Sequence, residues 1–252
     1  MVNAAFIFWL RLAMTGGGEQ EQAQAVRTMF GAIAAKYDFL NHLLSGNIDR
    51  SWRTRTAREV ERRIDVAHPR ILDVGCGTAD LALSFSRAGA VVGCDFCQPM
   101  LAIGREKISR ARVPYPVDLL EGDALCLPFS DAAFDAVVSA FVLRNLANVE
   151  KGLHEMGRVL RSGGTLGILD FAMPKMPVIG SLYRFYFTNV LPRIGRWVSR
   201  SEGAYTYLPQ SVQAFPPPER LRELVRSAGF NRVEFHYFTG GIAVLHVASK
   251  ER

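Results

Sequence analysis

The sequence is poor in cysteine and in long apolar stretches, and both shortages narrow the classes of protein it can be. Four cysteines in 252 residues form no disulfide framework, which favours a reduced, cytoplasmic protein. The pair Cys94-x-x-Cys97 leaves redox chemistry open, and the four thiols leave zinc open, although their spacing matches no standard zinc motif. The five histidines are scattered and no two are four residues apart, so we expect no metal site.

The N-terminus carries a short apolar run, MVNAAFIFWLRLAM, that is broken by Arg11. The run is too short to span a bilayer and lacks the basic start and cleavage site of a signal peptide. We therefore expect residues 1–22 to be a disordered or mis-started N-terminus, with translation beginning at Met14. A weak interfacial anchor is the alternative. Residues 23–252 are then expected to form a single domain.

The formal net charge of +6 suits an anionic partner such as a membrane surface or a nucleic acid, and it suits an ordinary basic enzyme equally well. Six arginines gather in a predicted helix within residues 50–63. Such a run is usually a solvated face, although it could also meet anionic lipid headgroups. No RNA-binding module is apparent, so we expect no nucleic-acid partner. These features leave a cytoplasmic, membrane-associated protein open.

Extended and helical patterns alternate along most of the chain after a predicted helix over Ala23–Leu44. This alternation indicates an α/β fold, with a parallel sheet covered by helices on both faces. The end of the chain differs, because residues 232–249 read as two strands joined around Gly240-Gly241, an antiparallel hairpin. The five parallel strands are predicted at 68–75, 90–95, 117–124, 134–141 and 165–171, and helices at 79–89, 98–111 and 148–164.

The stretch ILDVGCGTADLAL, residues 71–83, joins the first strand to a helix through Gly75-x-Gly77. It is similar to the start of the dinucleotide fingerprint G-x-G-x-x-G, but Asp80 stands where the third glycine belongs. A carboxylate in the first helical turn would repel a pyrophosphate and attract a cationic ligand. S-adenosylmethionine, with an ammonium and a sulfonium, is such a ligand.

Acidic residues also follow the next two strands, at the sheet edge where ligands of such folds bind. Asp95 ends the second strand about twenty residues beyond the first glycine, where an acid accepts ribose hydroxyls. Asp123, after the third strand, could accept a hydrogen bond from an adenine amino group. Asp80 could instead be a helix-dipole charge, and Asp95 and Asp123 could be turn formers, but their joint presence favours the cofactor.

Three further stretches carry a resemblance to a known family. MFGAIAAKYDFLNHLLSGNIDRSWR, FVLRNLANVEKGLHEMGRVLRSGGTLGILDF and the C-terminal part, YFTNVLPRIGRWVS to SVQAFPPPERLRELVRSAGF, are similar to the quinone-ring C-methyltransferases of menaquinone and ubiquinone synthesis. These are class I S-adenosylmethionine-dependent methyltransferases. The resemblance covers nearly the whole chain. It implies a Rossmann-like, seven-stranded, mostly parallel sheet with a C-terminal antiparallel hairpin and an N-terminal helical extension.

The same resemblance implies which residues form the cofactor site. The expected cofactor-binding residues are Asp73, Gly75, Gly77, Thr78, Asp95, Asp123 and Ala124. The chain departs from the family at Ala79, where glycine is usual, and at Ala140, where serine is common. The second departure leaves open whether Ser139 supplies the missing hydrogen bond.

The family's reaction, methylation of a ring carbon of a polyprenylated quinol, implies the catalytic residues. Demethylmenaquinol is the favoured substrate, and a benzoquinol of ubiquinone synthesis is the alternative. Carbon is a poor nucleophile, so a ring hydroxyl must ionise and its oxyanion must be stabilised. We expect Arg144 to stabilise the oxyanion, Asn145 to orient the hydroxyl and Tyr37 to cover the cofactor. A salt bridge for Arg144 and simple packing for Tyr37 are the plainer alternatives.

An aromatic and aliphatic stretch with interleaved arginines interrupts the sheet at 174–215. We expect a lid-like insertion there that holds the isoprenoid tail, with simple core packing as the alternative. Three other functions compete: another small-molecule or RNA methyltransferase of this fold, a catalytically silent cofactor-binding module, and a nicotinamide dehydrogenase. Acids at all three strand ends disfavour the silent module, and Asp80 disfavours the dehydrogenase.

Overall fold

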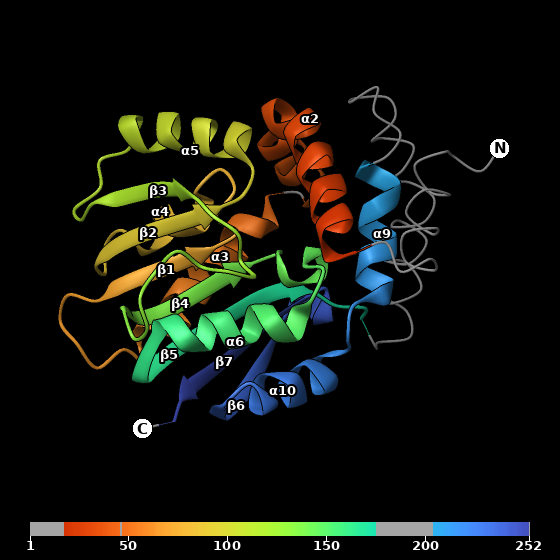
Figure 1. Cartoon of the computed structure of the whole chain (residues 1–252). Helices are drawn as coiled ribbons and strands as arrows, with labels where there is room; N and C mark the ends of the chain where they lie inside the picture. The colour runs from red at the N-terminus through yellow and green to blue at the C-terminus, as the bar shows by residue number, and fades with distance from the viewer. Residues whose placement is uncertain (1–17, 46, 175–203, 252) are drawn as a thin grey trace.

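The fold centres on one seven-stranded sheet in the order β3-β2-β1-β4-β5-β7-β6 (Figure 1). It is seen in a computed structural model that describes residues 18–45, 47–174 and 204–251. β1 to β5 run parallel, and β7 runs antiparallel to β5 and β6, so the expected architecture is confirmed. The strands are β1 (Arg70–Val74), β2 (Ala90–Asp95), β3 (Val117–Glu121), β4 (Phe134–Ala140), β5 (Leu160–Phe171), β6 (Phe230–Phe238) and β7 (Ala243–Lys250).

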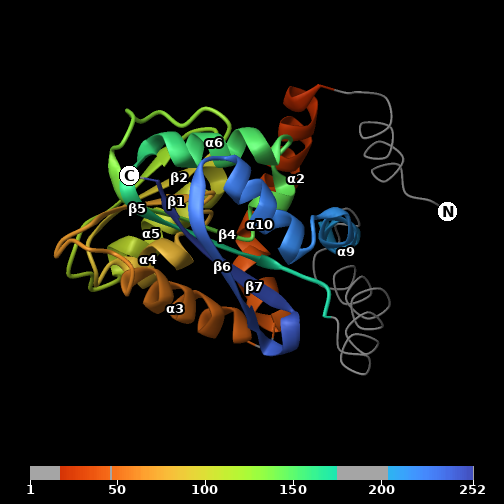
Figure 2. The same cartoon turned by 90° about the horizontal axis from the view of Figure 1, so that it is seen from below.

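Helices cover both faces of this sheet, as the near-continuous apolar strands require. Figure 2 shows α3 and α4 on one face and α6 and α10 on the other, while α2 and α9 lie at one end. Neighbouring residues of β1 point to opposite faces: Ile71 packs with α3 and α4, and Leu72 packs with α6 and α10. The described helices are α2 (Glu19–Ser45), α3 (Ile48–Glu61), α4 (Asp80–Phe85), α5 (Gln98–Arg110), α6 (Val149–Val159), α9 (Ala204–Ala214), α10 (Pro218–Ser227) and the 3₁₀ turns η1 (Leu143–Asn145) and η3 (Thr239–Gly241).

The predicted helix over 148–164 is wrong in its last five residues. α6 ends at Val159, and β5 begins at Leu160. Gly163 has a φ of +72°, and the β4–β5 pairing shifts register between Phe134 and Ala136. Because glycine adopts a positive φ without steric penalty, the strand continues through an irregularity there, and Gly163 caps no helix.

The N-terminal helix α2 begins at Glu19, four residues before the predicted start. Residues 19–22, which were expected to be disordered or mis-started, are therefore helical. The rest of that expectation, including the start at Met14, concerns residues 1–17, which lie outside the described part of the chain. The expected lid over 174–215 also falls largely outside it, since α9 follows a gap at 175–203.

Most arginines of the basic run remain exposed, but one arginine of α3 is buried. Arg53 is buried and forms an ion pair with Asp49 on the same helix. The guanidinium of Arg55 lies 4.3 Å from the centre of the Phe238 ring. Part of the predicted basic face is therefore used in packing. None of the helices in the described ranges combines the length and apolar character needed to cross a membrane.

A buried histidine lies where β7 meets α10. The Nε2 of His246 donates a hydrogen bond to the carbonyl of Pro218 over 2.9 Å, and Nδ1 has no hydrogen-bond partner in the described part of the chain. Burial lowers the pKa of His246 to about 4, and the positive charge of Arg222 adds to this shift. The folded protein therefore holds this side chain neutral at physiological pH.

We predict that this histidine makes the protein sensitive to acid. The pKa of His246 is lower in the folded than in the unfolded chain, so its contribution is complete above pH 6.5 and is lost as pH falls towards 4. The free energy of unfolding of the wild type should fall by about 3 kcal/mol more than that of His246→Gln across this range. Urea denaturation at several pH values measures this difference. His68→Gln, at an exposed site, is the control, and parallel curves for the wild type and His246→Gln would contradict the prediction.

Candidate active site

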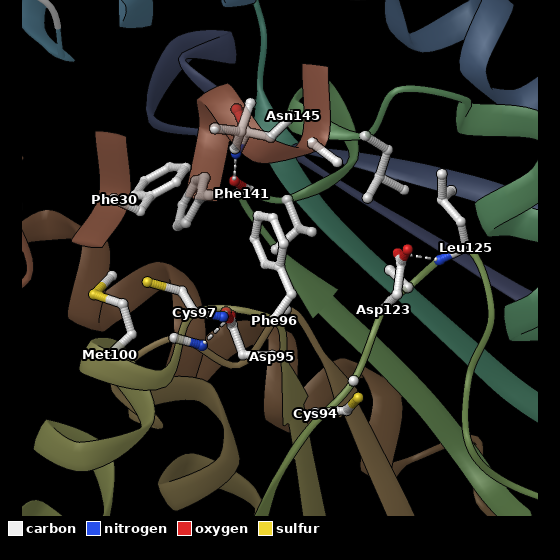
Figure 3. A pocket seen from close by; sticks show the side chains of 18 of the residues that line it. Phe30, Cys94, Asp95, Phe96, Cys97, Met100, Asp123, Leu125, Phe141 and Asn145 are labelled. Atoms are coloured by element: carbon white, nitrogen blue, oxygen red, sulfur yellow. Dashed lines mark hydrogen bonds between the residues drawn. The ribbon is translucent and has the colours of Figure 1, made fainter. Parts of the chain in front are cut away.

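A pocket lies beyond the carboxyl ends of β1 to β4, at the point where the strand order changes direction between β1 and β4 (Figure 3). This position suits a small-molecule ligand of an open α/β sheet. Three of the predicted site residues, Asp73, Thr78 and Arg144, are not among the lining residues. The predicted residues that line the pocket are Tyr37, Gly75, Gly77, Asp95, Asp123, Ala124 and Asn145.

The glycine turn forms the floor of this pocket. The φ of Gly75 is +70°, and a Cβ atom added there would lie 2.4 Å from the Val142 side chain, so only glycine fits. Gly77, with a φ of +52°, brings its backbone amide to within 2.8 Å of Asp95. Ala79, which replaces the family's usual glycine, also has a positive φ, of +68°, and is fully buried. The turn therefore keeps a left-handed backbone at this alanine.

Asp95 connects the glycine turn to the end of β2. One carboxylate oxygen accepts the Gly77 amide and the other accepts the Cys97 amide, each over 2.8 Å. Burial raises the pKa of Asp95, whereas these two amides and that of Phe96 lower it. Each oxygen has a second lone pair, so the carboxylate can hold the turn and still accept hydroxyl groups from a ligand.

Asp123 stands at the end of the neighbouring strand, on the other side of the pocket floor. Its Oδ1 accepts the amide of Leu125 over 2.9 Å, the geometry of a tight turn. The turn role is confirmed, and the adenine contact stays a prediction that the turn leaves possible, because a carboxylate used in a turn retains lone pairs for a ligand. Ala124 and Leu125 line the pocket beside it, and Phe96 lines it next to Asp95. Polar groups for a ribose and an adenine thus lie within an apolar slot.

The roof of the pocket comes from helix α2. Its lining residues recur at helical spacing along the chain: Ala23, Val26, Phe30 and Tyr37. The Phe30 and Tyr37 rings meet edge to face, with centroids 5.8 Å apart. Sequence reasoning singled out only Tyr37, although the same periodicity in residues 23–37 carried the signal for the others. Figure 3 shows Phe30 and Met100 together at one side of the pocket.

Two predicted cofactor residues lie behind the glycine turn. Asp73 is 1 % exposed, and burial raises its pKa to about 7, opposed in part by the amide of Ala82 and the charge of Arg53. Thr78 is buried as well, and its hydroxyl donates to Asp38 of α2 over 2.6 Å. Neither side chain lines the pocket, and direct contact of either residue with a cofactor stays a prediction.

The electrostatic argument from Asp80 needs correction. Asp80 is absent from the pocket lining and forms an ion pair with Lys107 of α5. A neighbouring ammonium offsets its charge, so Asp80 neither repels a pyrophosphate nor attracts a sulfonium as strongly as a free carboxylate. Ser139, the proposed substitute for the family's serine, donates its hydroxyl to the Val74 carbonyl over 2.8 Å and is fully buried. It therefore does not face the pocket.

The predicted catalytic pair divides between the pocket and the protein behind it. Asn145 lines the pocket; its Nδ2 donates to the Phe141 carbonyl over 3.2 Å. Arg144 forms a buried ion pair with Asp170, with 2.8 Å between Nη1 and Oδ1 and exposed side-chain fractions of only 6 % and 3 %. The alternative considered for Arg144, a surface salt bridge, is therefore present as a buried ion pair, and the catalytic role stays a prediction.

A residue that the sequence gave no reason to select completes this group. Tyr207 of α9 donates its hydroxyl to Oδ1 of Asn145 over 3.0 Å. Burial raises the pKa of Tyr207, while the charges of Arg144 and Asp170 act on it in opposite directions. Tyr207 lies 62 positions beyond Asn145 in the chain, so no local pattern could pair them.

The cysteines give no support to redox chemistry. All four are free thiols; Cys94 and Cys97 line the pocket. Burial raises the pKa of Cys94 to about 12 and also raises the pKa of Cys97, so the reactive thiolate is disfavoured at both. Within the described ranges, no three His, Cys, Asp or Glu side chains converge in a way that could hold a metal ion.

Comparison with known proteins identifies the family. The profile of the ubiE/COQ5 methyltransferase family matches residues 17–250. The chain belongs to this family. It is 45 % identical to the demethylmenaquinone methyltransferase of Deinococcus radiodurans, over 93 % of this chain and 96 % of that one. It is 47 % identical to the Thermus thermophilus protein of the same name, over 88 % and 100 % of the two chains.

Solved structures agree on the fold. A SAM-dependent methyltransferase from Thermotoga maritima matches with a TM-score of 0.60, 18 % identity and coverage of 90 % and 100 % of the two chains. The [4+2]-cyclase SpnF matches with a TM-score of 0.66, also at 18 % identity, over 91 % and 96 %. The family and fold confirm the predicted class, an S-adenosylmethionine-dependent methyltransferase of quinone synthesis. The cyclase shows that the fold alone does not fix the reaction.

The described residues fit S-adenosylmethionine. The slot combines a glycine turn with no room for a side chain, an acid that keeps free lone pairs at each of two neighbouring strand ends, and apolar walls. These groups suit a ribose and an adenine ring held between apolar walls. Asp95 would hold the ribose, and Asp123 with Ala124 would hold the adenine.

Replacing Asp95 tests this assignment. Asp95→Ala loses charge-assisted hydrogen bonds of about 1.5–3 kcal/mol each, so S-adenosylhomocysteine should bind at least about tenfold more weakly by isothermal titration calorimetry. Asp118→Ala, an exposed carboxylate on β3 outside the pocket, is the control and should bind normally. Circular dichroism must show a folded protein. Unchanged affinity in folded Asp95→Ala would falsify the assignment.

Proposed function

We propose that this chain methylates a ring carbon of demethylmenaquinol, with S-adenosylmethionine as the methyl donor. The names of relatives that are 45 % and 47 % identical over nearly their whole length support this substrate. The structural observation that carries the proposal is the group formed by Asn145, Tyr207 and the buried Arg144–Asp170 pair at the edge of the cofactor pocket. A polar group of this kind beside apolar walls suits a quinol ring whose hydroxyl must ionise.

S-adenosylmethionine, when bound, supplies a methyl group on a positively charged sulfur. The task of the protein is to place the ring carbon and to favour the ionised form of the neighbouring ring hydroxyl. Most residues around the proposed position of the ring are apolar, and they exclude water. The exclusion of water strengthens the electrostatic interactions inside the pocket. The apolar lining residues that follow the carboxyl end of β4 are Phe141, Val142 and Leu146.

Asn145 orients the ring hydroxyl in this proposal. One of its N–H groups is used by the Phe141 carbonyl, and one lone pair of Oδ1 is used by Tyr207. An amide side chain has two donors and two lone pairs, so one of each remains for a ligand. Because both bonds also fix which end of the amide is oxygen, the ring hydroxyl meets a defined donor and a defined acceptor.

Arg144 favours the ionised quinol from behind Asn145. Asp170 offsets most of its charge, and burial raises the pKa of Asp170 against the opposing effect of Arg144. The Nε–H of Arg144 has no hydrogen-bond partner in the described part of the chain. Because Arg144 does not line the pocket, this unused donor would act on a developing oxyanion through one water molecule.

The substrate's tail and the membrane remain parts of the proposal that rest on sequence. The expected tail-holding segment falls mostly at 175–203, outside the described residues. On α3, the arginines that stay exposed, Arg50 and Arg58 among them, are available for anionic headgroups. A relative from Geobacter, 40 % identical over 91 % of this chain, is named as a ubiquinone/menaquinone C-methyltransferase, which keeps the benzoquinol as a second candidate.

The decisive test replaces Arg144 by lysine. Lysine keeps a positive charge against buried Asp170, so the fold should survive, but it lacks the planar guanidinium and its Nε–H. Turnover of demethylmenaquinol should fall by about a hundredfold to a thousandfold, as for the loss of one oxyanion donor, while S-adenosylhomocysteine affinity stays within about threefold. Single-turnover transfer of a labelled methyl group measures this.

The matched control is Arg161→Lys. Arg161 pairs with Asp135 at the opposite end of β4. The Arg161→Lys variant should keep wild-type turnover. Raising the pH should partly restore Arg144→Lys, because solvent then ionises more of the quinol. Near-normal turnover in Arg144→Lys would leave Arg144 with a structural role only. A parallel assay with the demethylated benzoquinol decides between the two substrates.

Removing the Tyr207 hydroxyl tests the orientation of Asn145. Tyr207→Phe keeps the aromatic ring but removes the hydrogen bond to Oδ1 of Asn145, so the side-chain amide of Asn145 can rotate by 180° and exchange its oxygen and nitrogen. The turnover number should fall by about tenfold or more, with little change in S-adenosylhomocysteine affinity. Tyr237→Phe, on an exposed tyrosine of β6, serves as control. If Tyr207→Phe had wild-type turnover, the hydrogen bond would have no part in positioning.

A further inference from the structure

Helix α2 closes the cofactor pocket, yet it belongs to neither the sheet nor its covering helices. Its apolar side lines the pocket through Val26, Phe30 and Tyr37. A bound cofactor would therefore lie between the strand ends and this helix. Side chains of α2, Phe30 among them, form one wall of the pocket (Figure 3), so an outward movement of α2 would uncover a bound ligand.

Among the described side chains, the polar side of α2 contacts the rest of the protein at three places around the pocket. Near its start, Glu19 accepts a hydrogen bond from Nδ2 of Asn148 over 2.9 Å. Further along, Arg27 forms an ion pair with Glu121 at the end of β3. These first two contacts involve exposed side chains and contribute little by themselves.

The third contact, made by Asp38, differs from the first two because several polar side chains meet there. Asp38 of α2 accepts the Thr78 hydroxyl over 2.6 Å at one carboxylate oxygen and the Lys107 ammonium over 3.0 Å at the other. Lys107 also lies 3.2 Å from the Thr78 hydroxyl and forms an ion pair with Asp80. The four side chains come from α2, the glycine turn, α4 and α5.

The side chains of this cluster are largely shielded from solvent, so their electrostatic interactions are stronger than those of exposed pairs. The side chains of Lys107, Asp38 and Asp80 are 26 %, 27 % and 22 % exposed, and Thr78 is buried. Two carboxylates share one ammonium, so removing the cation would leave like charges facing each other. Asp38 directly follows the pocket residue Tyr37, which couples the cluster to the wall of the pocket.

We propose that Asp38 and Lys107 are positioning residues that hold α2 closed over the cofactor, and that exchange of the cofactor requires this cluster to open. Thr78 then acts on the cofactor through α2, since its hydroxyl points to Asp38. The inference concerns cofactor exchange and is independent of which quinol is methylated. Tests with S-adenosylhomocysteine alone therefore separate it from the proposed function.

Asp38→Asn is the sharpest variant. It weakens only the contact of α2, because Lys107 retains its ion pair with Asp80 and the glycine turn keeps its amide bonds to Asp95. Labelled S-adenosylhomocysteine should leave the preloaded variant at least about tenfold faster than the wild type when diluted into an excess of unlabelled ligand. Truncating one partner of a shielded charge pair acts mainly on dissociation.

Two further variants complete the experiment. Glu21→Gln makes the same chemical change at an exposed position of α2 and should release the ligand at the wild-type rate within about twofold. Lys107→Met should release it at least as fast as Asp38→Asn, and Lys107→Arg should restore slow release, because the cation is kept.

A second measurement tests the motion of α2 directly. Limited proteolysis of the ligand-loaded protein should cut α2 faster in Asp38→Asn than in the wild type, while cleavage elsewhere and thermal unfolding stay similar. A folded Asp38→Asn variant with wild-type ligand release and wild-type cleavage of α2 would overturn the proposal.

Discussion

The arrangement of the site depends on one carboxylate that is used twice. Asp95 binds the amides of Gly77 and Cys97, and it thereby joins the turn after β1 to the start of α5. An acid buried this deeply is stable as an anion only when such donors compensate its desolvation. The same donors hold the turn in its left-handed conformation. The groups that make Asp95 tolerable in the fold therefore also shape the floor on which a ribose would rest.

This double use explains why the sequence was informative about the floor of the pocket. Parallel strands end at a common edge, so acids that close successive strands must lie near one another. That reasoning placed Asp95 and Asp123 correctly relative to the pocket. It failed for Asp80, because the distance to Lys107 depends on how α4 and α5 pack, which no local pattern encodes. Strand alternation predicted the parallel sheet, but the sequence did not predict the end of α6, since a glycine pair such as Gly163-Gly164 occurs both after helices and in irregular strands.

The roof of the pocket was predictable only in part, for a physical reason. Periodicity shows that α2 has an apolar side, but a helix buries that side against whatever the tertiary fold offers. The contacts that choose this place for α2 join residues 40 and 69 positions apart, Asp38 with Thr78 and with Lys107. Contacts made by α9 have the same character: Tyr207 reaches Asn145 from beyond strand β5. Residues that act through such partners carry no signal in their own neighbourhood.

The cofactor end and the proposed quinol end of the site differ in how their carboxylates are compensated. Around the cofactor, carboxylates are held by backbone amides at Asp95 and Asp123, which leaves their remaining lone pairs to a ligand. At the other end, the carboxylate of Asp170 is held by Arg144, and both the Nε–H of Arg144 and Oδ2 of Asp170 lack a hydrogen-bond partner in the described part of the chain. A ligand with hydroxyl and amino donors fits the first end, and a ring that becomes an anion fits the second. The two ends of the pocket therefore differ in how their charges are compensated: backbone amides hold the carboxylates at one end, and an arginine holds the carboxylate at the other.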